Sequence, residues 1–236
     1  MSKTRVLVVE DDRSLAEVLV YNLQQHGFEV TVSHDGQDAV NRARLNPPDI
    51  VILDVMLPIL DGHEVCRFLR ADPATRQTRI LMLTAKSEES DQLIGFALGA
   101  DDYVTKPFSV KVLLQRIKVL ERTRTEDAAE GDMVMHQDVV IDRRRHTATV
   151  RGVALPLTRT EFRLLDTLVR QPGRVFLRSE LIDAALGKDM VVLERTIDVH
   201  IRALRKKMRD AANLIETVRG VGYRFQDQLP ENLPVN

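Results

Sequence analysis

The stretch that decides the fold is Val6-Leu7-Val8-Val9-Glu10-Asp11-Asp12, in which four apolar residues lead directly into three acidic ones. Such a short apolar run is typical of a strand that is buried on both faces of a parallel sheet. It is too short for a membrane span or for the apolar core of a signal peptide. Because ligands bind at the carboxyl ends of parallel strands, we expect these acids to mark the functional edge of the sheet.

Four more strand-like runs follow before residue 120, and amphipathic stretches lie between them. This alternation predicts an α/β fold with a five-stranded, doubly wound parallel sheet. The predicted strands are residues 6–9, 29–32, 50–53, 80–83 and 102–105. The predicted helices are residues 14–26, with Leu15, Val18, Leu19 and Leu23 toward the core, residues 35–44, and residues 109–123, with Val112, Leu113, Ile117 and Leu120 toward the core.

A second domain is predicted after a polar stretch. Residues 123–132 contain no apolar side chain larger than Ala, so they are interpreted as a linker. Beyond them, two apolar runs predict a hairpin, three helical stretches follow, and residues 216–225 predict a further strand pair around a glycine turn. This order is typical of an α+β domain. The predicted boundaries are a first domain at 4–122, a linker at 123–132, a second domain at 133–226 and a loose tail at 227–236.

The composition agrees with two packed domains. The chain has 236 residues, of which 44% are hydrophobic and 29% charged, as in globular proteins. A net charge of -1 gives no whole-chain sign of a nucleic-acid partner, and no membrane partner is expected. The single cysteine, Cys66, cannot form an internal disulfide, which favours a reducing compartment and predicts a cytoplasmic location.

Polar residues follow four of the predicted strands. Glu10 and Asp11 follow the first, Asp54 the third, Thr84 the fourth and Lys106 the fifth. Carboxylates that meet at one edge repel each other unless a cation neutralises them. Mg²⁺ prefers oxygen ligands, so we expect Mg²⁺ on the acids and a backbone carbonyl. The lysine and the threonine hydroxyl would then contact phosphoryl oxygens.

At these residues the chain resembles a bacterial response regulator receiver domain over residues 4–122, with a flavodoxin-like strand order of 2-1-3-4-5. The resemblance implies that Asp54 accepts a phosphoryl group from a sensor histidine kinase. It also implies that Thr84 and Tyr103 form a switch, that Lys106 contacts the phosphate, and that the Lys106-Pro107 bond is cis. The implied Mg²⁺ ligands are Glu10, Asp11, Asp54 and the backbone carbonyl of Met56. The motifs are Val8-Val9-Glu10-Asp11-Asp12, Leu53-Asp54-Val55-Met56-Leu57-Pro58-Ile59-Leu60-Asp61-Gly62, Leu83-Thr84-Ala85 and Gly99-Ala100-Asp101-Asp102-Tyr103-Val104-Thr105-Lys106-Pro107-Phe108.

Two alternatives stay open for the first domain. A haloacid dehalogenase type phosphatase would also use an aspartate after an apolar strand, but it needs a carboxylate two residues on as acid and base. Met56 stands there, so the acyl phosphate should persist, and we expect a switch rather than a turnover enzyme. The other alternative is a constitutive scaffold or a DNA-binding protein that acts independently of phosphate.

The second domain contains a basic amphipathic helix at residues 193–209. Ile197, Ile201, Leu204 and Met208 recur at core spacing. At about 100° per residue, the opposite face carries positive charge and two small apolar side chains, a surface that the major groove accepts. A solvated basic helix is the alternative interpretation. That face consists of Arg195, Val199, Arg202, Ala203 and Lys206.

Over residues 133–226 the chain resembles the winged helix effector of the OmpR and PhoB subfamily, a winged helix-turn-helix domain. The similarity lies in residues 157–165, 178–181, 195–207 and 217–225. It implies a recognition helix at 195–209 and a wing at 219–223. Two departures concern readout: Ala203 stands where relatives often carry Arg, and Leu186 where they often carry Trp, just before the loop 187–192 that the resemblance places at RNA polymerase. The implied DNA contacts to promoter DNA are Arg195, Thr196, Val199, His200, Arg202, Ala203, Arg205, Lys206, Thr217 and Arg219.

The resemblance further implies a homodimer when the receiver is phosphorylated, which would bind direct-repeat half-sites about one helical turn apart. Gln92, Ala97 and Val112 replace residues that relatives usually use in charge pairs. Exposed ion pairs contribute about 0 to 1 kcal/mol each, so we expect a weaker dimer rather than none. The predicted dimer face consists of Asp101, Asp102, Arg116, Lys118 and Arg122.

Overall fold

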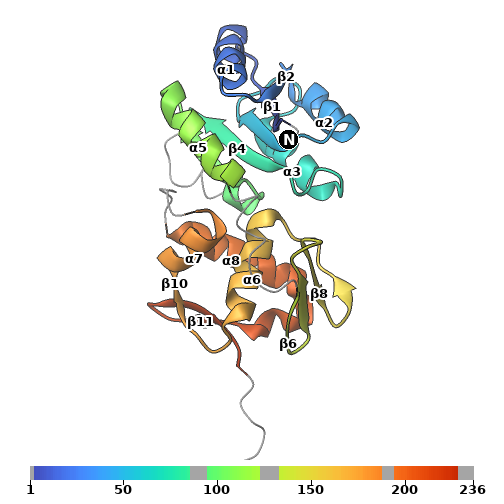
Figure 1. Cartoon of the computed structure of the whole chain (residues 1–236), viewed down its shortest axis with the longest axis vertical. Helices are drawn as coiled ribbons and strands as arrows, with labels where there is room; N and C mark the ends of the chain where they lie inside the picture. The colour runs from blue at the N-terminus through green and yellow to red at the C-terminus, as the bar shows by residue number, and fades with distance from the viewer. Residues whose placement is uncertain (1–2, 86–94, 123–132, 188–193, 228–236) are drawn as a thin grey trace, which may run out of the picture. The chain divides into compact units, whose positions relative to one another are not determined.

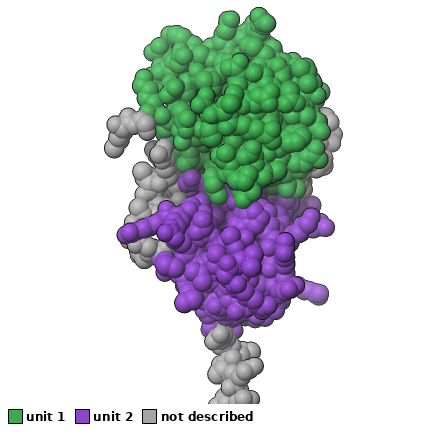
Figure 2. All heavy atoms as spheres, turned by 90° about the vertical axis from the view of Figure 1, so that its right-hand side faces the viewer, with its two compact units in different colours: residues 1–124 green, residues 125–236 purple. Residues whose placement is uncertain are grey.

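The computed structural model describes residues 3–85, 95–122, 133–187 and 194–227. The chain divides into two compact units, Met1–Arg124 and Thr125–Asn236 (Figure 2). The predicted linker at 123–132 lies outside the described residues, so its bounds stay a prediction. In the described part of the chain, no helix is both long enough and apolar enough to cross a membrane.

The first unit is built on the predicted parallel sheet. Its five strands lie in the order β2-β1-β3-β4-β5, which confirms both the fold class and the strand order. All residues of β3 and β4 are buried, as expected for strands that are covered on both faces. The strands are β1 (Arg5–Val9), β2 (Glu29–Ser33), β3 (Ile50–Asp54), β4 (Arg79–Thr84) and β5 (Asp102–Thr105).

Helices cover both faces of this sheet. Figure 1 shows α1 and α5 on one face and α2 and α3 on the other. Aspartates cap three of the helices: the side chains of Asp12, Asp35 and Asp61 each accept a backbone N–H of the first turn. Gly27 ends α1 with a φ of 87°, a left-handed conformation that glycine adopts without strain. The helices are α1 (Arg13–Gln25), α2 (Gly36–Leu45), α3 (Gly62–Ala71) and α5 (Val110–Arg122).

Two residues that were expected in the core are exposed. Val18 is 46% exposed and Val112 is 43% exposed. Each lies next to a core residue, Leu19 or Leu113, and a step of about 100° around the helix turns it toward solvent. The helix α3 is not predicted from the sequence, although Val65, Cys66 and Leu69 form its buried stripe.

The second unit has the predicted α+β layout. A four-stranded antiparallel sheet, β6-β7-β8-β9, precedes α6, α7 and α8. A three-stranded sheet, β10-β12-β11, joins β10, which lies between α6 and α7, to the two strands that follow α8. The hairpin of β7 and β8 was predicted, whereas β6, β9 and β10 were not. The elements are β6 (Met133–His136), β7 (Val139–Asp142), β8 (Thr147–Val150), β9 (Val153–Ala154), α6 (Arg159–Arg170), β10 (Phe176–Leu177), α7 (Arg178–Ala185), α8 (Arg195–Met208), a 3-10 helix η2 (Arg209–Leu214), β11 (Ile215–Val218) and β12 (Gly222–Phe225).

The core of the second unit lies among its helices. Helix α6 begins with a capping box, in which Thr158 and Glu161 satisfy each other's backbone N–H groups. The predicted core stripe of α8, Ile197, Ile201, Leu204 and Met208, is buried at 2% exposure or less, which confirms the amphipathic pattern. The opposite side of α8 is therefore left to face away from the unit.

Candidate functional site

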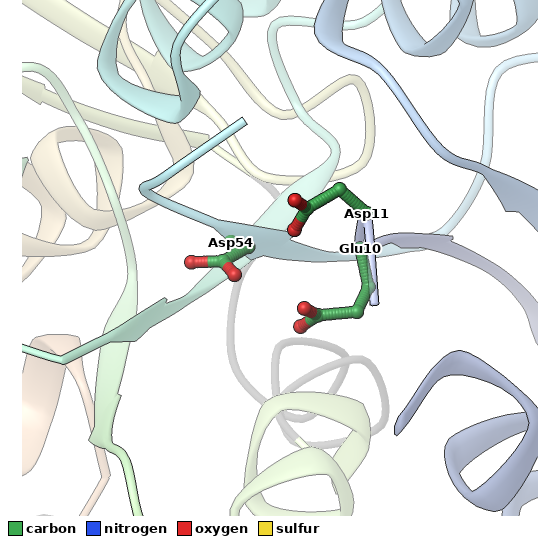
Figure 3. A group of neighbouring side chains, drawn as sticks. All are labelled: Glu10, Asp11 and Asp54. Atoms are coloured by element: carbon green, nitrogen blue, oxygen red, sulfur yellow. The ribbon is translucent and has the colours of Figure 1, made fainter. Parts of the chain in front are cut away.

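Three acids meet at the carboxyl edge of the first sheet. Glu10 and Asp11 follow β1, and Asp54 ends β3, so neighbouring strands bring them together. Each offers a ligand oxygen within 4.8 Å of the others, and Figure 3 shows the three side chains at the ends of their strands. Glu10 and Asp54 are buried, at 1% and 4% exposure, whereas Asp11 is exposed. The predicted convergence of these acids is therefore present.

Backbone contacts fix this corner. The carbonyl of Glu10 contacts Nδ1 of His34 at 2.8 Å, and the Gly62 N–H donates to the Val55 carbonyl at 3.0 Å. A Cβ on Gly62 would lie only 2.1 Å from the carbonyl oxygen of Asp54. Glycine thus lets the start of α3 approach the end of β3 closely. Neither His34 nor Gly62 was singled out from the sequence, although an Asp-Gly pair eight residues beyond a strand end is a signal for such an approach.

Lys106 lies between the two buried acids. Its Nζ donates to Asp54 Oδ2 at 2.6 Å and to Glu10 Oε2 at 2.8 Å. The loop that carries it leaves β5 and is tied to β4, because the Lys106 N–H donates to the Thr84 carbonyl at 2.7 Å. The Lys106-Pro107 bond is cis, as the resemblance implied. The ammonium therefore links the two buried carboxylates.

Burial and neighbouring charges shift the pKa values of Glu10 and Lys106. Burial raises the pKa of Glu10 to about 7; the hydrogen bond from Lys106 opposes this, and the charge of Asp54 adds to it. Burial by itself lowers the pKa of Lys106, but its hydrogen bonds to Asp54 and Glu10 outweigh burial and raise that pKa. The pocket thus holds more negative charge than its one lysine neutralises. A hard divalent cation with oxygen ligands fits this donor set.

The remaining predicted pocket residues lie in the loop after β3, at the end of β4 and in β5. The Met56 N–H donates to Asp54 Oδ1 at 3.1 Å, while its side chain is 67% exposed. Thr84 is buried at the end of β4. Tyr103 is 7% exposed, and its hydroxyl occupies the space that a Cβ on Gly95 would need. The tyrosine is therefore turned inward in this structure.

The second site is the outward face of α8. Arg195, Arg202 and Lys206 are exposed there, and Val199 and Ala203 are partly exposed, as the helical pattern predicted. Arg219 is exposed in the turn between β11 and β12. These side chains form a basic surface on a helix and a neighbouring hairpin, an arrangement that suits a polyanion.

Some residues implied as DNA contacts are instead used within the fold. Thr196 and His200 are 1% exposed, so the expectation that they face DNA is corrected: both lie on the core side of α8. The guanidinium of Arg205 donates to the Ile215 carbonyl at 2.7 Å and to the Thr217 hydroxyl at 2.8 Å. Arg205 and Thr217 are thus engaged with each other in this chain.

The predicted dimer face stays a prediction, but two of its acids have partners inside the chain. Asp101 Oδ2 accepts from Arg70 Nη2 at 2.7 Å, and the two side chains are 5% and 8% exposed. Asp102 is completely buried and pairs with Arg116 at 2.9 Å. Burial raises the pKa of Asp102 to about 6, and the charge of Arg116 opposes the shift. Lys118 and Ala97 are exposed, Gln92 lies outside the described residues, and the Arg122 side chain is not described.

Comparison with known families identifies both halves of the chain. Residues 6–118 match the response regulator receiver domain, and residues 152–225 match the C-terminal domain of transcriptional regulatory proteins. The two matches correspond to the pocket of acids in the first unit and to the α8 surface in the second.

Relatives share nearly the whole chain. The phosphate regulon transcriptional regulatory protein PhoB of Rhizobium meliloti is 44% identical over 224 residues, which are 94% of this chain and 98% of the relative. The sensory transduction protein RegX3 of Mycolicibacterium smegmatis is 42% identical over 229 residues, 94% and 99% of the two chains. The crystal structure of DrrB, a Thermotoga maritima OmpR/PhoB homologue, has a TM-score of 0.51 at 31% identity and covers 96% of this chain and 100% of its own.

Proposed function

Because this chain belongs to the OmpR/PhoB subfamily of response regulators, which are phosphorylatable transcription factors, we propose that Asp54 is its phosphoacceptor and α8 its DNA-reading helix. A response regulator with a DNA-binding domain implies a histidine kinase as one partner and DNA as the other. The observation that carries the proposal for Asp54 is the position of Lys106, which donates to both Asp54 and Glu10 beside Asp11.

We assign the metal site to the same corner. Asp11, Asp54 and the backbone carbonyl of Met56 would hold Mg²⁺, with Glu10 beside them, because these are the hard oxygen donors that Mg²⁺ prefers. When bound, the ion supplies positive charge that offsets the charge on the phosphoryl oxygens. The loop between β3 and α3 orients Asp54, since the Met56 N–H holds one of its oxygens at 3.1 Å.

The transfer needs little from the protein beyond position and charge. An oxygen of Asp54 forms a bond to phosphorus as the bond from phosphorus to the donor's imidazole nitrogen breaks, and that nitrogen leaves with the electron pair. Lys106 moves from the free carboxylate to a phosphoryl oxygen, and the Thr84 hydroxyl donates to another. Because Met56 stands where a phosphatase carries its acid and base, the acyl phosphate persists, and the domain acts as a switch.

The second unit converts this switch into DNA binding. Arg195, Arg202 and Lys206 on α8 and Arg219 on the wing position the domain on phosphates, while Val199 and Ala203 meet base edges in the major groove. Phosphorylated receivers pair into a homodimer, so two effector domains occupy direct-repeat half-sites. The segment after Leu186 is the region that would meet RNA polymerase.

The test compares the wild type with Asp54→Asn, which keeps the size of the side chain and removes the nucleophile. We expect acetyl phosphate and Mg²⁺ to add one phosphoryl group to the wild type, measured as intact mass, and none to Asp54→Asn. Phosphorylation should raise the molar mass by light scattering toward that of a dimer and increase DNA affinity. A variant that takes up phosphate or regulates like the wild type would favour a scaffold or phosphate-independent protein instead.

A further inference from the structure

In the first turn of α8, side chains from three elements meet at one carboxylate. Asp198, in the first turn of α8, accepts the Tyr223 hydroxyl at 2.7 Å and the Arg178 Nε–H at 2.8 Å, both on Oδ1. Tyr223 lies in β12, the second strand of the wing, and Arg178 is the first residue of α7. A single oxygen of α8 is therefore bonded to the wing and to the preceding helix.

The ring of Tyr223 is also fixed by contacts. The ring is buried, and the guanidinium carbons of Arg178 and Arg205 lie 5.4 Å and 5.5 Å from its centroid, within the range of cation–π attraction. Arg205 comes from α8 and also bonds β11 through Ile215 and Thr217. Both strands of the wing are thus fixed to α8 by a group of four side chains, which we call the Asp198 hub: Arg178, Asp198, Arg205 and Tyr223.

The Tyr223 hydroxyl keeps its proton across ordinary pH. Burial and the hydrogen bond to Asp198 raise the pKa of Tyr223 to about 12, so its hydroxyl remains a donor. The fit of the wing is also tight at the backbone, because a Cβ on Gly222 would lie 2.0 Å from the Phe176 carbonyl oxygen. The wing is therefore held by backbone pairing with β10 and by side-chain contacts to α8.

This arrangement matters for recognition because two separate elements must meet one duplex. Arg202 and Lys206 face outward from α8, and Arg219 faces outward from the wing turn. Their spacing depends on the contacts between α8 and the wing, which among the described residues are made by Asp198, Arg205 and Tyr223. Catalysis and binding both lose efficiency when groups that act together are misplaced by about 1 Å.

We propose that Asp198 is a positioning residue that sets the angle between the recognition helix and the wing, so that both engage a single DNA site. This rests on the proposed function of α8. The competing interpretation is that Asp198 is only an acid near a basic surface, which weakens attraction to phosphates. The two interpretations predict opposite signs for the effect of removing its charge on specific binding.

The experiment uses the full chain and DNA duplexes selected from a random pool by the wild type. Affinities are measured for a selected duplex and for a scrambled duplex of equal length and composition. The variants are Asp198→Asn, Tyr223→Phe and their double, with Asp210→Asn as the control, since Asp210 is an exposed acid of the same unit outside the Asp198 hub. Thermal unfolding identifies any variant that has lost its fold.

Positioning predicts that Asp198→Asn loses about tenfold in affinity for the selected duplex, while affinity for the scrambled duplex stays equal or rises because a negative charge is gone. Tyr223→Phe, which changes no charge, should lose about threefold on the selected duplex only. The double variant should bind no more weakly than Asp198→Asn, because both substitutions break the same bond.

A purely electrostatic role predicts instead that Asp198→Asn and Asp210→Asn both strengthen binding to the two duplexes, and that Tyr223→Phe changes nothing. That result would overturn the proposal and leave the function of α8 intact. If the wild type selects no sequence from the pool, the proposed DNA reading itself fails. Equal losses on selected and scrambled duplexes would show general damage to the domain and would also overturn the positioning role.

Discussion

The pocket of acids in the first unit has buried charged groups, whereas the outward face of α8 in the second unit has exposed ones. In the pocket, Glu10 and Asp54 are buried and held by Lys106. On α8, Arg202 and Lys206 are exposed, whereas Thr196 and His200 of the same helix are buried on its core side. Chemistry at a phosphoryl group needs preorganised charge in a protected site, whereas attraction to DNA needs charge that can reach phosphates.

Removing a buried charge should have the largest effect. Arg70→Ala leaves Asp101 buried without its guanidinium, so we expect the free energy of unfolding to fall by about 3 to 5 kcal/mol in urea titrations. Arg67→Ala on the same helix is the matched control, because Arg67 is 62% exposed and should change stability by less than about 0.5 kcal/mol. If the two variants are equally stable, the ion pair of Asp101 with Arg70 does not stabilise the fold, and Asp101 stays a candidate for the dimer face.

A pH dependence should follow from Asp102. Its pKa is about 6 in the folded chain and about 3.9 in an unfolded one, so between these values the folded state binds an extra proton. Lowering the pH from 7 to 4.5 should therefore stabilise the wild type relative to Asp102→Asn by about 2 kcal/mol. Urea unfolding at both pH values measures this difference. A stability gap that is the same at pH 7 and pH 4.5 would contradict a raised pKa.

A substitution in the loop between β3 and α3 should give a smaller change, a gain in stability. Ile59 is 80% exposed and has a φ of 70°, a left-handed conformation that costs a β-branched residue about 1 kcal/mol or more. Ile59→Gly should therefore raise the free energy of unfolding by about 1 kcal/mol. Met56→Gly, in the same loop and also exposed, has no such strain to relieve and should lower stability. The idea fails if both glycine variants are destabilised alike.

The smallest expected effect is on the salt dependence of DNA affinity, and it distinguishes exposed basic side chains from those paired within the fold. Arg202→Ala should lower the slope of log affinity against log salt by about 0.9, because one phosphate contact is lost. Lys207→Met should leave the slope unchanged, since Lys207 is paired with the buried Glu161 of α6. Electrophoretic or anisotropy titrations over a range of salt give both slopes. A reduced slope for Lys207→Met would mean that this lysine also reaches DNA.

The strands and the meeting of the acids could be predicted from the sequence because both follow from local pattern. Apolar runs of four residues mark buried parallel strands, and the topology then places Glu10, Asp11 and Asp54 at one edge. The core stripe of α8 follows in the same way from its spacing, with Ile201 at its centre.

The ion-pair partners of individual charged side chains could not be predicted, because those partners lie far away in the sequence. Asp101 pairs with Arg70, which is 31 positions away, and Lys207 pairs with Glu161, which is 46 positions away. Neither distance leaves a local signal. Thr196 was assigned to the DNA surface by its place in a motif, although it lies four and eight residues before His200 and Leu204, and all three are buried along one side of α8.

Each unit contains one buried tyrosine, and this gives the chain its own pair of optical reporters. Tyr103 lies in the first unit and Tyr223 in the second, while the third tyrosine, Tyr21, is 64% exposed, and the sequence has no tryptophan to mask them. In a Tyr21→Phe background, exchanging one buried tyrosine for phenylalanine leaves a fluorophore in a single unit. The melting of receiver and effector can then be followed separately in the intact chain, without any attached dye.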